Sequence, residues 1–302
     1  MKTLRFYVRF LPSFTAIGYV ARGLPLRAFG ADFTGQTWLV TGATGGIGRA
    51  VAMEAADAGA NVIAVGRRSD PLEELATASG GRIAAVQADL SSIEANQNLA
   101  RRYPEVNVLI NNVGILEATH ALTTEGFGRM YATNLLGHYA LTSGLLRHGV
   151  LADGLIVNIT SGGAYNAMLN LAGLDAPPES FNGFTAYASQ KRAQIALADH
   201  WNHEFPRLQA YAMHPGWVRT EGVRGSLAWM DRRIGTILRT PHQGADTIMW
   251  LAAARPTPVL DAIWFDRAPR TAHAYRSTRR PLATTGSLVA RLEQDLARTG
   301  AS

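Results

Sequence analysis

The segment 37–58 limits the fold of this chain more than any other part of the sequence. Residues 37–40 are typical of a short buried strand, which runs into the glycine-rich segment 41–48 and then into an alanine-rich helical segment, 49–58. The turn contains these glycines: Gly42, Gly46 and Gly48. Such glycines allow a tight turn, close approach to a pyrophosphate and close helix–strand packing, and the helix start directs free N–H groups at the phosphates. The pattern predicts a dinucleotide-binding unit.

The rest of the chain alternates between short apolar runs and helical periods. Further strands are expected at 61–65, 82–87, 106–110, 155–160, 208–213 and 262–265. Helices are expected at 71–78, 91–102, 124–146, from near Tyr187 to 204, and 243–253. This alternation is typical of a parallel sheet covered on both faces, so the expected class is α/β, a doubly wound Rossmann fold. We expect one domain, 34–268, with an N-terminal extension, 1–33, and a tail, 269–302, that holds one helix near 286–298.

Composition excludes several classes of function. The 302 residues are 47% hydrophobic, enough for a large core, and contain no cysteine, so disulfides and thiolate metal sites are excluded. We expect no metal site and a cytoplasmic location, with membrane association as the alternative. The formal charge of +6 comes from scattered arginines that are not interleaved with aromatic residues, so no nucleic-acid partner is expected.

The N-terminal extension is apolar and basic. Its apolar residues are interrupted by Arg9, Pro12, Arg22 and Pro25, so no run reaches the ~18 residues of a membrane span. Three readings remain open: a leader packed on the domain, an interfacial anchor that gives peripheral membrane contact through residues 1–30, and a cleaved signal.

Tyr187 and Lys191 lie four residues apart in a predicted helix, on one face. A nearby ammonium favours the phenolate and draws the pKa of a tyrosine from ~10 towards neutral. Such a tyrosine could exchange a proton with a carbonyl or an alcohol. The chain has only two lysines, Lys2 and Lys191, among many arginines, and this supports a specific role for the ammonium.

Two arginines follow the second predicted strand. Gly66 stands where an acidic residue would bind the ribose hydroxyls of NAD(H), and Arg67 and Arg68 come next. A guanidinium suits a 2′-phosphate, so we expect NADP(H) rather than NAD(H), with Arg67 as the main contact. Two solvated arginines in a turn are the alternative.

These motifs together resemble the short-chain dehydrogenases/reductases over residues 35–265. The ordered elements are the glycine-rich turn, Asp89-Leu90, Asn111 to Gly114, Asn134, Thr160-Ser161, Tyr187 with Lys191, and Pro215-Gly216 through Thr220. Because Gly45 and Gly46 are adjacent, the turn fits both the compact and the extended spacing. The Asn111 to Gly114 run and the Ser–Tyr–Lys order favour the compact type.

The resemblance implies a role for each matching residue. Tyr187 would be the general acid/base, and Lys191 would lower its pKa and hold the nicotinamide ribose. Ser161 would stabilise the substrate oxygen, Asn134 would hold a water linked to Lys191, and Thr220 would bind the carboxamide. Further implied cofactor contacts are Gly42, Thr44, Gly46, Ile47, Gly48, Arg67, Arg68, Asp89, Leu90, Asn111, Val113, Gly114, Tyr187, Lys191, Pro215, Gly216, Val218 and Thr220. Taken singly, Asn134, Ser161 and Thr220 could equally be a core amide and two caps.

Four segments resemble an orphan group of this family, dehydrogenase/reductase member 12. They are residues 161–163, 213–217, 243–247 and 281–285, so the resemblance extends into the tail.

The spacing between Ser161 and Tyr187 is longer than compact members usually have. We expect this segment to cover the site and, with Trp217, Trp229 and Met230, to form an apolar wall suited to lipophilic carbonyls. The apolar residues of the segment are Met168, Leu169, Leu171, Leu174, Pro177, Pro178 and Phe181. Such a segment could also block a dimer face, so a homodimer and a monomer both remain open.

The leading hypothesis is an NADP(H)-dependent oxidoreductase that interconverts a lipophilic aldehyde or ketone and its alcohol. The alternative is a cofactor-binding sensor or scaffold with little turnover.

Overall fold

The computed structural model describes residues 9–27, 29–226 and 228–299. At its centre is an eight-stranded sheet with the order β3-β2-β1-β4-β5-β6-β7-β8. All neighbours are parallel except β7 and β8, which are antiparallel. The strands are β1 (Thr37–Thr41), β2 (Asn61–Gly66), β3 (Ile83–Gln87), β4 (Val108–Asn111), β5 (Leu155–Ile159), β6 (Gln209–Met213), β7 (Ala262–Phe265) and β8 (Ala268–Thr271). The doubly wound α/β fold predicted from the sequence is confirmed.

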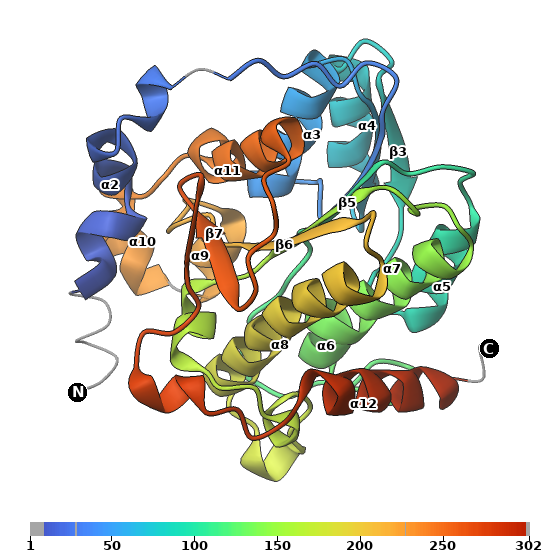
Figure 1. Cartoon of the computed structure of the whole chain (residues 1–302), viewed down its shortest axis with the longest axis vertical. Coiled ribbons are helices and arrows are strands. Elements are labelled where there is room, and N and C mark those ends of the chain that lie inside the picture. The colour runs from blue at the N-terminus through green and yellow to red at the C-terminus, as the bar shows by residue number, and fades with distance from the viewer. Residues whose placement is uncertain (1–8, 28, 227, 300–302) are drawn as a thin grey trace.

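Helices cover both faces of the sheet and divide the core into two layers (Figure 1). One layer lies under α3 (Gly46–Asp57), α4 (Ser69–Ala78) and α11 (Pro241–Ala254). The other lies under α5 (Ile93–Arg101), α7 (Gly137–Arg147) and α8 (Gly183–Glu204), with α12 (Thr285–Ala297) packed outside α8. Central strands such as β4 and β5 are buried along their whole length, which explains their continuous apolar sequences.

The strand order reverses between β1 and β4. These two strands are neighbours although β2 and β3 lie between them in the sequence. In open α/β sheets, ligands bind outside the carboxyl ends of the strands at such a switch point. The glycine-rich turn follows β1 and the segment 112–114 follows β4, so both reach this edge.

The helix expected at 124–146 begins later than predicted. It consists of a short turn, α6 (Arg129–Tyr131), a π-helical turn (Ala132–Leu136) and α7. Gly126 has φ +82°, a left-handed conformation that ends a helix, and its N–H donates to Thr123 O in a separate turn. The segment before Arg129 is therefore a loop.

Three elements in the carboxyl-terminal half of the chain were not predicted from the sequence. They are α9 (Glu221–Ser226), α10 (Ala228–Ile234) and the edge strand β8. β8 begins at 268, so the sheet extends past the boundary at which we expected the tail to start. It is exposed and contains Pro269, which an edge strand tolerates, and its sequence has no apolar alternation that would have revealed it.

The N-terminal segment packs on the domain. Residues 9–14 and α2 (Ala16–Ala21) are helical, and Phe14 and Tyr19 are buried. Residues 1–8, the start of the predicted extension, lie outside the described residues. Within the described part of the chain, no helix has the length and apolarity needed to cross a bilayer.

Candidate active site

The glycine-rich turn joins β1 to α3 at positions where a side chain would not fit. Gly42 and Gly46 have φ of +67° and +54°. A Cβ on Gly48 would lie 2.4 Å from Gly42 O, and a Cβ on Gly46 would lie 2.9 Å from Thr220 Cγ2. Because α3 begins at Gly46, the N–H groups of its first turn, including Ile47, have no partners within the helix. The turn forms a cradle that suits a pyrophosphate.

Asn112 fastens this turn to β4. Its amide donates to Thr41 O at 2.7 Å and to Gly42 O at 3.2 Å. Thr41 Oγ1 in turn accepts from the N–H groups of Asn112 and Val113, at 2.9 and 3.1 Å. Sequence reasoning chose Asn111 and Val113 and missed Asn112, although it lies between them.

Asn111 points into the core instead. Its amide donates to Thr142 Oγ1 at 3.1 Å and to Asn158 Oδ1 at 3.0 Å, and its side chain is buried. It connects β4 to α7 and β5, so the amide that faces the glycine-rich turn belongs to Asn112.

Arg67 and Arg68 are both exposed at the end of β2, next to the turn. Arg68 pairs with Glu221 at 3.1 Å and lies beside Gly45, whereas no ion pair of Arg67 is found within the described residues. A Cβ on Gly66 would lie 2.4 Å from Thr44 Cγ2, so the turn packs directly on this strand end.

The end of β3 contributes two of the predicted residues. The carboxylate of Asp89 is exposed and accepts from the N–H and hydroxyl of Ser91, at 3.0 and 2.9 Å. Leu90 is buried.

Asn134 lies in the π-helical turn and joins the segment after β4 to α8. Its Oδ1 accepts from Ile115 N at 2.8 Å, while its Nδ2 donates to Ile115 O at 2.9 Å and to Gln190 Oε1 at 2.8 Å. A Cβ on Gly114 would lie 3.4 Å from both Asn134 Oδ1 and Lys191 Nζ. Gly114, Asn134 and Lys191 therefore converge, and π-helical turns are frequent at functional sites.

Ser161, Tyr187 and Lys191 also come together. Asn182 caps the first turn of α8 by accepting from Thr185 N at 3.0 Å, and Tyr187 and Lys191 follow one turn apart. Lys191 Nζ lies 5.7 Å from the centre of the Tyr187 ring. Ser161, just after β5, hydrogen-bonds to Tyr187 and also accepts from Gly163 N at 3.1 Å.

The loop after β6 reaches over the start of α3. Gly216 has φ +80°, and a Cβ there would lie 2.4 Å from Arg239 Nε and 2.7 Å from Phe14 O. The Thr220 side chain lies against Gly46, and that of Val218 lies against Gly244 of α11. The loop from Pro215 to Thr220 thus closes the edge of the sheet between the glycine-rich turn and the N-terminal segment.

Comparisons with known proteins agree with this geometry. A family model for short chain dehydrogenases matches residues 36–231, more than half of the chain. The chain belongs to the short chain dehydrogenase family. It is therefore an oxidoreductase of a family that binds nicotinamide cofactors.

The chain is also similar to individual proteins of known sequence or structure. Human dehydrogenase/reductase SDR family member 12 is 35% identical over 276 residues, 86% of this chain and 84% of its own length. This confirms the resemblance to the member 12 group. Mouse retinol dehydrogenase 13 is 29% identical, over 78% of this chain and 77% of its own. A gluconate 5-dehydrogenase candidate from Beutenbergia cavernae, solved with bound NADP at low occupancy, is 28% identical with a TM-score of 0.60, covering 77% of this chain and 95% of its own.

The pKa of Tyr187 differs from the prediction that the Lys191 ammonium draws it towards neutral. Burial raises the pKa of the Tyr187 phenol, and the hydrogen bond from Ser161 only partly opposes this. Burial also lowers the pKa of Lys191 from 10.5 to about 7. In the protein alone, the ammonium therefore does not draw the tyrosine towards neutral, because desolvation disfavours the charged form of both groups. At neutral pH this short chain dehydrogenase holds Tyr187 protonated.

The segment between Ser161 and Tyr187 folds through three 3-10 turns: Gly162–Asn166, Leu171–Gly173 and Pro178–Ser180. Leu169 and Leu174 are buried in the core, while the side chains of Trp229 and Met230 lie outside what the structure describes. The predicted apolar wall is therefore seen only in part.

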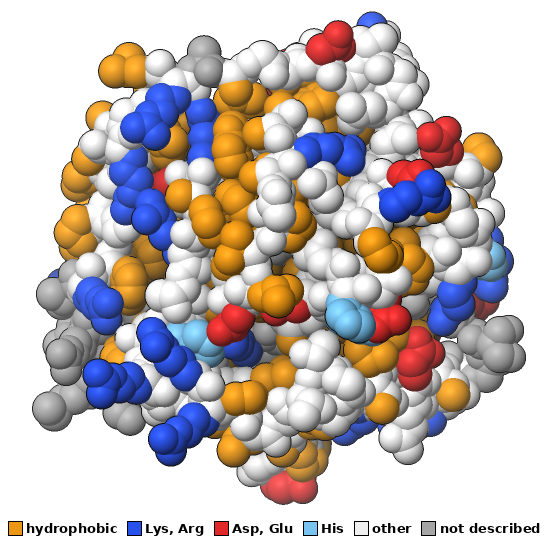
Figure 2. Space-filling model, in the orientation of Figure 1, with side chains coloured by type: hydrophobic (Ala, Val, Ile, Leu, Met, Phe, Trp, Pro, Cys, Tyr) orange, Lys and Arg blue, Asp and Glu red, His pale blue; other side chains and the backbone are white. Residues whose placement is uncertain are grey.

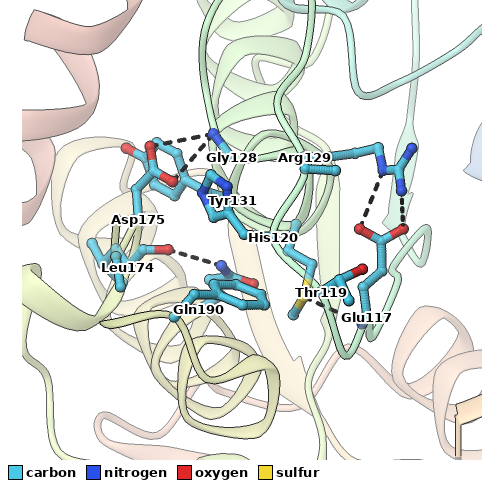
Figure 3. Close-up of a pocket in the computed structure, with 13 residues that line it drawn as sticks. Glu117, Thr119, His120, Gly128, Arg129, Tyr131, Leu174, Asp175 and Gln190 are labelled. Atoms are coloured by element: carbon cyan, nitrogen blue, oxygen red, sulfur yellow. Dashed lines mark hydrogen bonds and ion pairs between the residues drawn. The ribbon is translucent and has the colours of Figure 1, made fainter. Parts of the chain in front are cut away.

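Figure 3 shows a small cavity beside this segment. Leu174, Asp175 and Gln190 lie on one side of it, and Glu117, His120 and Arg129 lie on the other. Its volume of about 10 Å³ is close to that of one water molecule. It is too small for an organic substrate, although Gln190 links it to Asn134.

Proposed function

We propose that this short chain dehydrogenase is an NADP(H)-dependent oxidoreductase that interconverts a lipophilic aldehyde or ketone and its alcohol. The observation that carries the proposal is the grouping of Tyr187, Lys191 and Ser161 beside the segment that follows β4. A protein that only bound a cofactor would not need a half-buried phenol one helical turn from a buried ammonium. This argues against the alternative of a sensor or scaffold.

The residues around the turn fit a nicotinamide dinucleotide. The positions of Gly46 and Gly48 admit no Cβ, so the backbone is open to close approach by a pyrophosphate. Arg67 offers an exposed guanidinium for a 2′-phosphate. This supports a preference for NADP(H) over NAD(H).

Each residue would have a separate task. The cofactor, when bound, supplies or accepts the hydride. Tyr187, held protonated by burial, would donate its proton to the carbonyl oxygen in reduction, and Ser161 would stabilise the charge that develops on that oxygen. Lys191 would hold the nicotinamide ribose. Asn134 holds the backbone of Ile115 and so fixes the segment after β4, which would border the cofactor.

Turnover of a carbonyl panel tests the proposal. NADPH oxidation is followed with aliphatic, aromatic and isoprenoid aldehydes and ketones, and Tyr187→Phe is compared with the native protein. Loss of general acid catalysis should lower kcat by about 10²–10⁴-fold while the NADPH dissociation constant stays the same. Full turnover by Tyr187→Phe, or no turnover by the native protein with any carbonyl, would reject the proposal.

We also propose that the enzyme is cytoplasmic and contacts a membrane surface through its N-terminal segment. Ile17, Val20 and Leu26 are 54%, 59% and 90% exposed, and the exposed Arg27 lies beside them. Basic and apolar side chains lie side by side on the left of Figure 2, where Figure 1 has α2. Such a surface suits anionic lipid headgroups.

Vesicle flotation tests this contact. Replacing Ile17, Val20 and Leu26 by serine should lower partitioning onto phosphatidylserine vesicles by at least tenfold, because burial of even one apolar side chain in the membrane contributes about 1.5–3 kcal/mol. These substitutions leave the buried Phe14 and Tyr19 in place, so the fold is kept. Equal partitioning of both proteins would refute the contact.

A further inference from the structure

We infer that Gln194 and His138 are positioning residues that fix Lys191 and tie it to the backbone of Val113. The inference rests on the proposed role of Tyr187 and Lys191. Neither residue was chosen from the sequence. Gln194 lies three residues after Lys191 in α8, and His138 lies four residues after Asn134, so each is on the same helix face as a predicted catalytic residue.

The ammonium of Lys191 is surrounded by neutral acceptors. It donates to Ile159 O at 2.8 Å and to Gln194 Oε1 at 3.3 Å, and its side chain is buried. The other titratable groups that face it are Tyr187 and His138. Because no carboxylate among the described residues pairs with Lys191, these two oxygens and the face of the Tyr187 ring stabilise its charge.

The orientation of the Gln194 amide is determined by its other contacts. Its Nε2 donates to Asn134 O at 2.6 Å and lies 2.9 Å from His138 Nδ1. Because the Asn134 carbonyl can only accept, its contact requires the amide nitrogen on that side and leaves Oε1 facing Lys191, an obligatory donor. The side chain is fully buried, and a flipped amide would lose the hydrogen bonds to Asn134 O and Lys191.

The same logic fixes the tautomer of His138. Nδ1 must accept from Gln194, so the proton is on Nε2, which then donates to Val113 O at 2.9 Å. Burial, with the charge of Lys191 as the next cause, lowers the pKa of His138 to about 3. The imidazole is therefore a neutral connector and not an acid or a base.

These bonds form one chain from the ammonium to the cofactor edge. Lys191 donates to Gln194, Gln194 donates to His138, and His138 donates to Val113, which follows β4 and borders the glycine-rich turn through Thr41. Since Gln194 also donates to Asn134 O, the π-helical turn is held by the same amide. Gln194 is the member that connects Lys191 to His138, so its removal breaks the route from the ammonium to Val113 and leaves Lys191 its bond to Ile159 O.

Nuclear magnetic resonance of the cofactor-free protein tests the chain without any turnover. In ¹⁵N-labelled protein, His138 should be the Nε2–H tautomer and should not titrate between pH 5 and pH 9. In Gln194→Leu the donor to Nδ1 is gone, so the Nδ1 signal of His138 should shift, while the proton stays on Nε2 opposite Val113 O. A native His138 with its proton on Nδ1, or one that titrates near its ordinary pKa, would overturn the inference.

The pH profile of carbonyl reduction tests the consequence for Lys191. Gln194 favours the charged lysine, so Gln194→Leu should lower kcat about tenfold and move the alkaline decline of kcat/KM to lower pH by about one unit. Gln194→Glu places a carboxylate beside Lys191 and should move the decline to higher pH than in the native protein, because a nearby anion favours the ammonium. Gln97→Leu, a matched change of a buried glutamine in α5, should leave the profile in place.

The outcomes separate this inference from the proposed function. If Tyr187→Phe abolishes turnover but Gln194→Leu has the native pH profile, only the positioning role is wrong. If the native protein reduces no carbonyl, the proposed function is wrong, and the state of His138 still decides whether the hydrogen-bond chain exists.

Discussion

The two neighbouring arginines after β2 differ in whether a carboxylate pairs with the guanidinium. Arg68 pairs with Glu221, although both side chains are more than half exposed, whereas no ion pair of Arg67 is found within the described residues. An exposed pair of this kind contributes little stability, so it matters for ligand binding rather than for folding. Arg67 is therefore the better candidate for the 2′-phosphate.

Arg67→Asp should weaken NADPH binding by about 1.5–3 kcal/mol, the range for a hydrogen bond to a charged group. Calorimetric titration should show the loss for NADPH and only a small change for NADH, since NADH has no 2′-phosphate. Arg68→Asp is the matched control and should have the smaller effect. An unchanged NADPH dissociation constant in Arg67→Asp would exclude the assignment.

The candidate residues that the sequence did predict share one property. Tyr187, Lys191 and Ser161 belong to short local motifs, and the order of strands in a doubly wound sheet brings such motifs to one edge. Gln194 and His138 could not be chosen in this way, because their role depends on which atoms they meet across two helices. The raised pKa of Tyr187 was missed because burial is a property of the folded chain.

At the scale of elements, a cluster of three charged side chains joins the N-terminal segment to the β7–β8 hairpin: Asp266, Arg239 and Arg22. Asp266 accepts from Arg239 at 2.6 and 2.9 Å and from Arg22 at 2.8 Å. Arg239 also donates to Ser13 O and Phe14 O, each at 3.1 Å. Phe14 O accepts from Trp217 N at 2.7 Å as well, so the loop from Pro215 to Thr220 is part of this arrangement.

Asp266→Asn should destabilise the protein by about 3–5 kcal/mol, because it leaves the fully buried Arg239 without a counter-charge. Urea unfolding measures this loss. We expect weaker NADPH binding in the same variant, since Phe14 O and the loop at Trp217 would shift. Arg22→Gln removes the more exposed partner and should cost less. A loss below about 1 kcal/mol for Asp266→Asn would show that the pair does not hold these elements.

Sequence patterns predicted the strands that are apolar runs and failed where a strand has no such run. The parallel strands from β1 to β7 are apolar runs and were found within a few residues of their bounds. β8 is an edge strand without such a run, and its hairpin turn, Asp266 and Arg267, is left-handed at both residues without a glycine to mark it. The Arg239–Asp266 pair stabilises this turn, and no local pattern encodes a contact between residues so far apart.

At the scale of the whole molecule, two buried histidines link folding to protons. Burial lowers the pKa of His214 from 6.5 to about 3, with the charge of Arg239 as a second cause, and His138 behaves similarly. Above pH 6.5 both imidazoles are neutral in the folded and the unfolded chain. Below it, only the unfolded chain takes up protons, so this contribution to stability is lost as the pH falls. Asp199, whose pKa burial raises to about 6, acts in the opposite direction between pH 6 and its unfolded value.

Comparing the pH dependence of stability in the native protein and in His214→Leu isolates the contribution of His214. The His214 ring packs against Phe14, Tyr165 and Phe265, and its Nδ1 has no hydrogen-bond partner among the described residues, so leucine removes little bonding there. Below pH 6.5, native stability should fall more steeply than that of His214→Leu, by up to about 1.4 kcal/mol per pH unit. Urea unfolding at pH 7.5, 6.5, 5.5 and 5.0 measures both slopes. Parallel slopes would mean that His214 takes up its proton in the folded protein and is not as enclosed as its aromatic neighbours suggest.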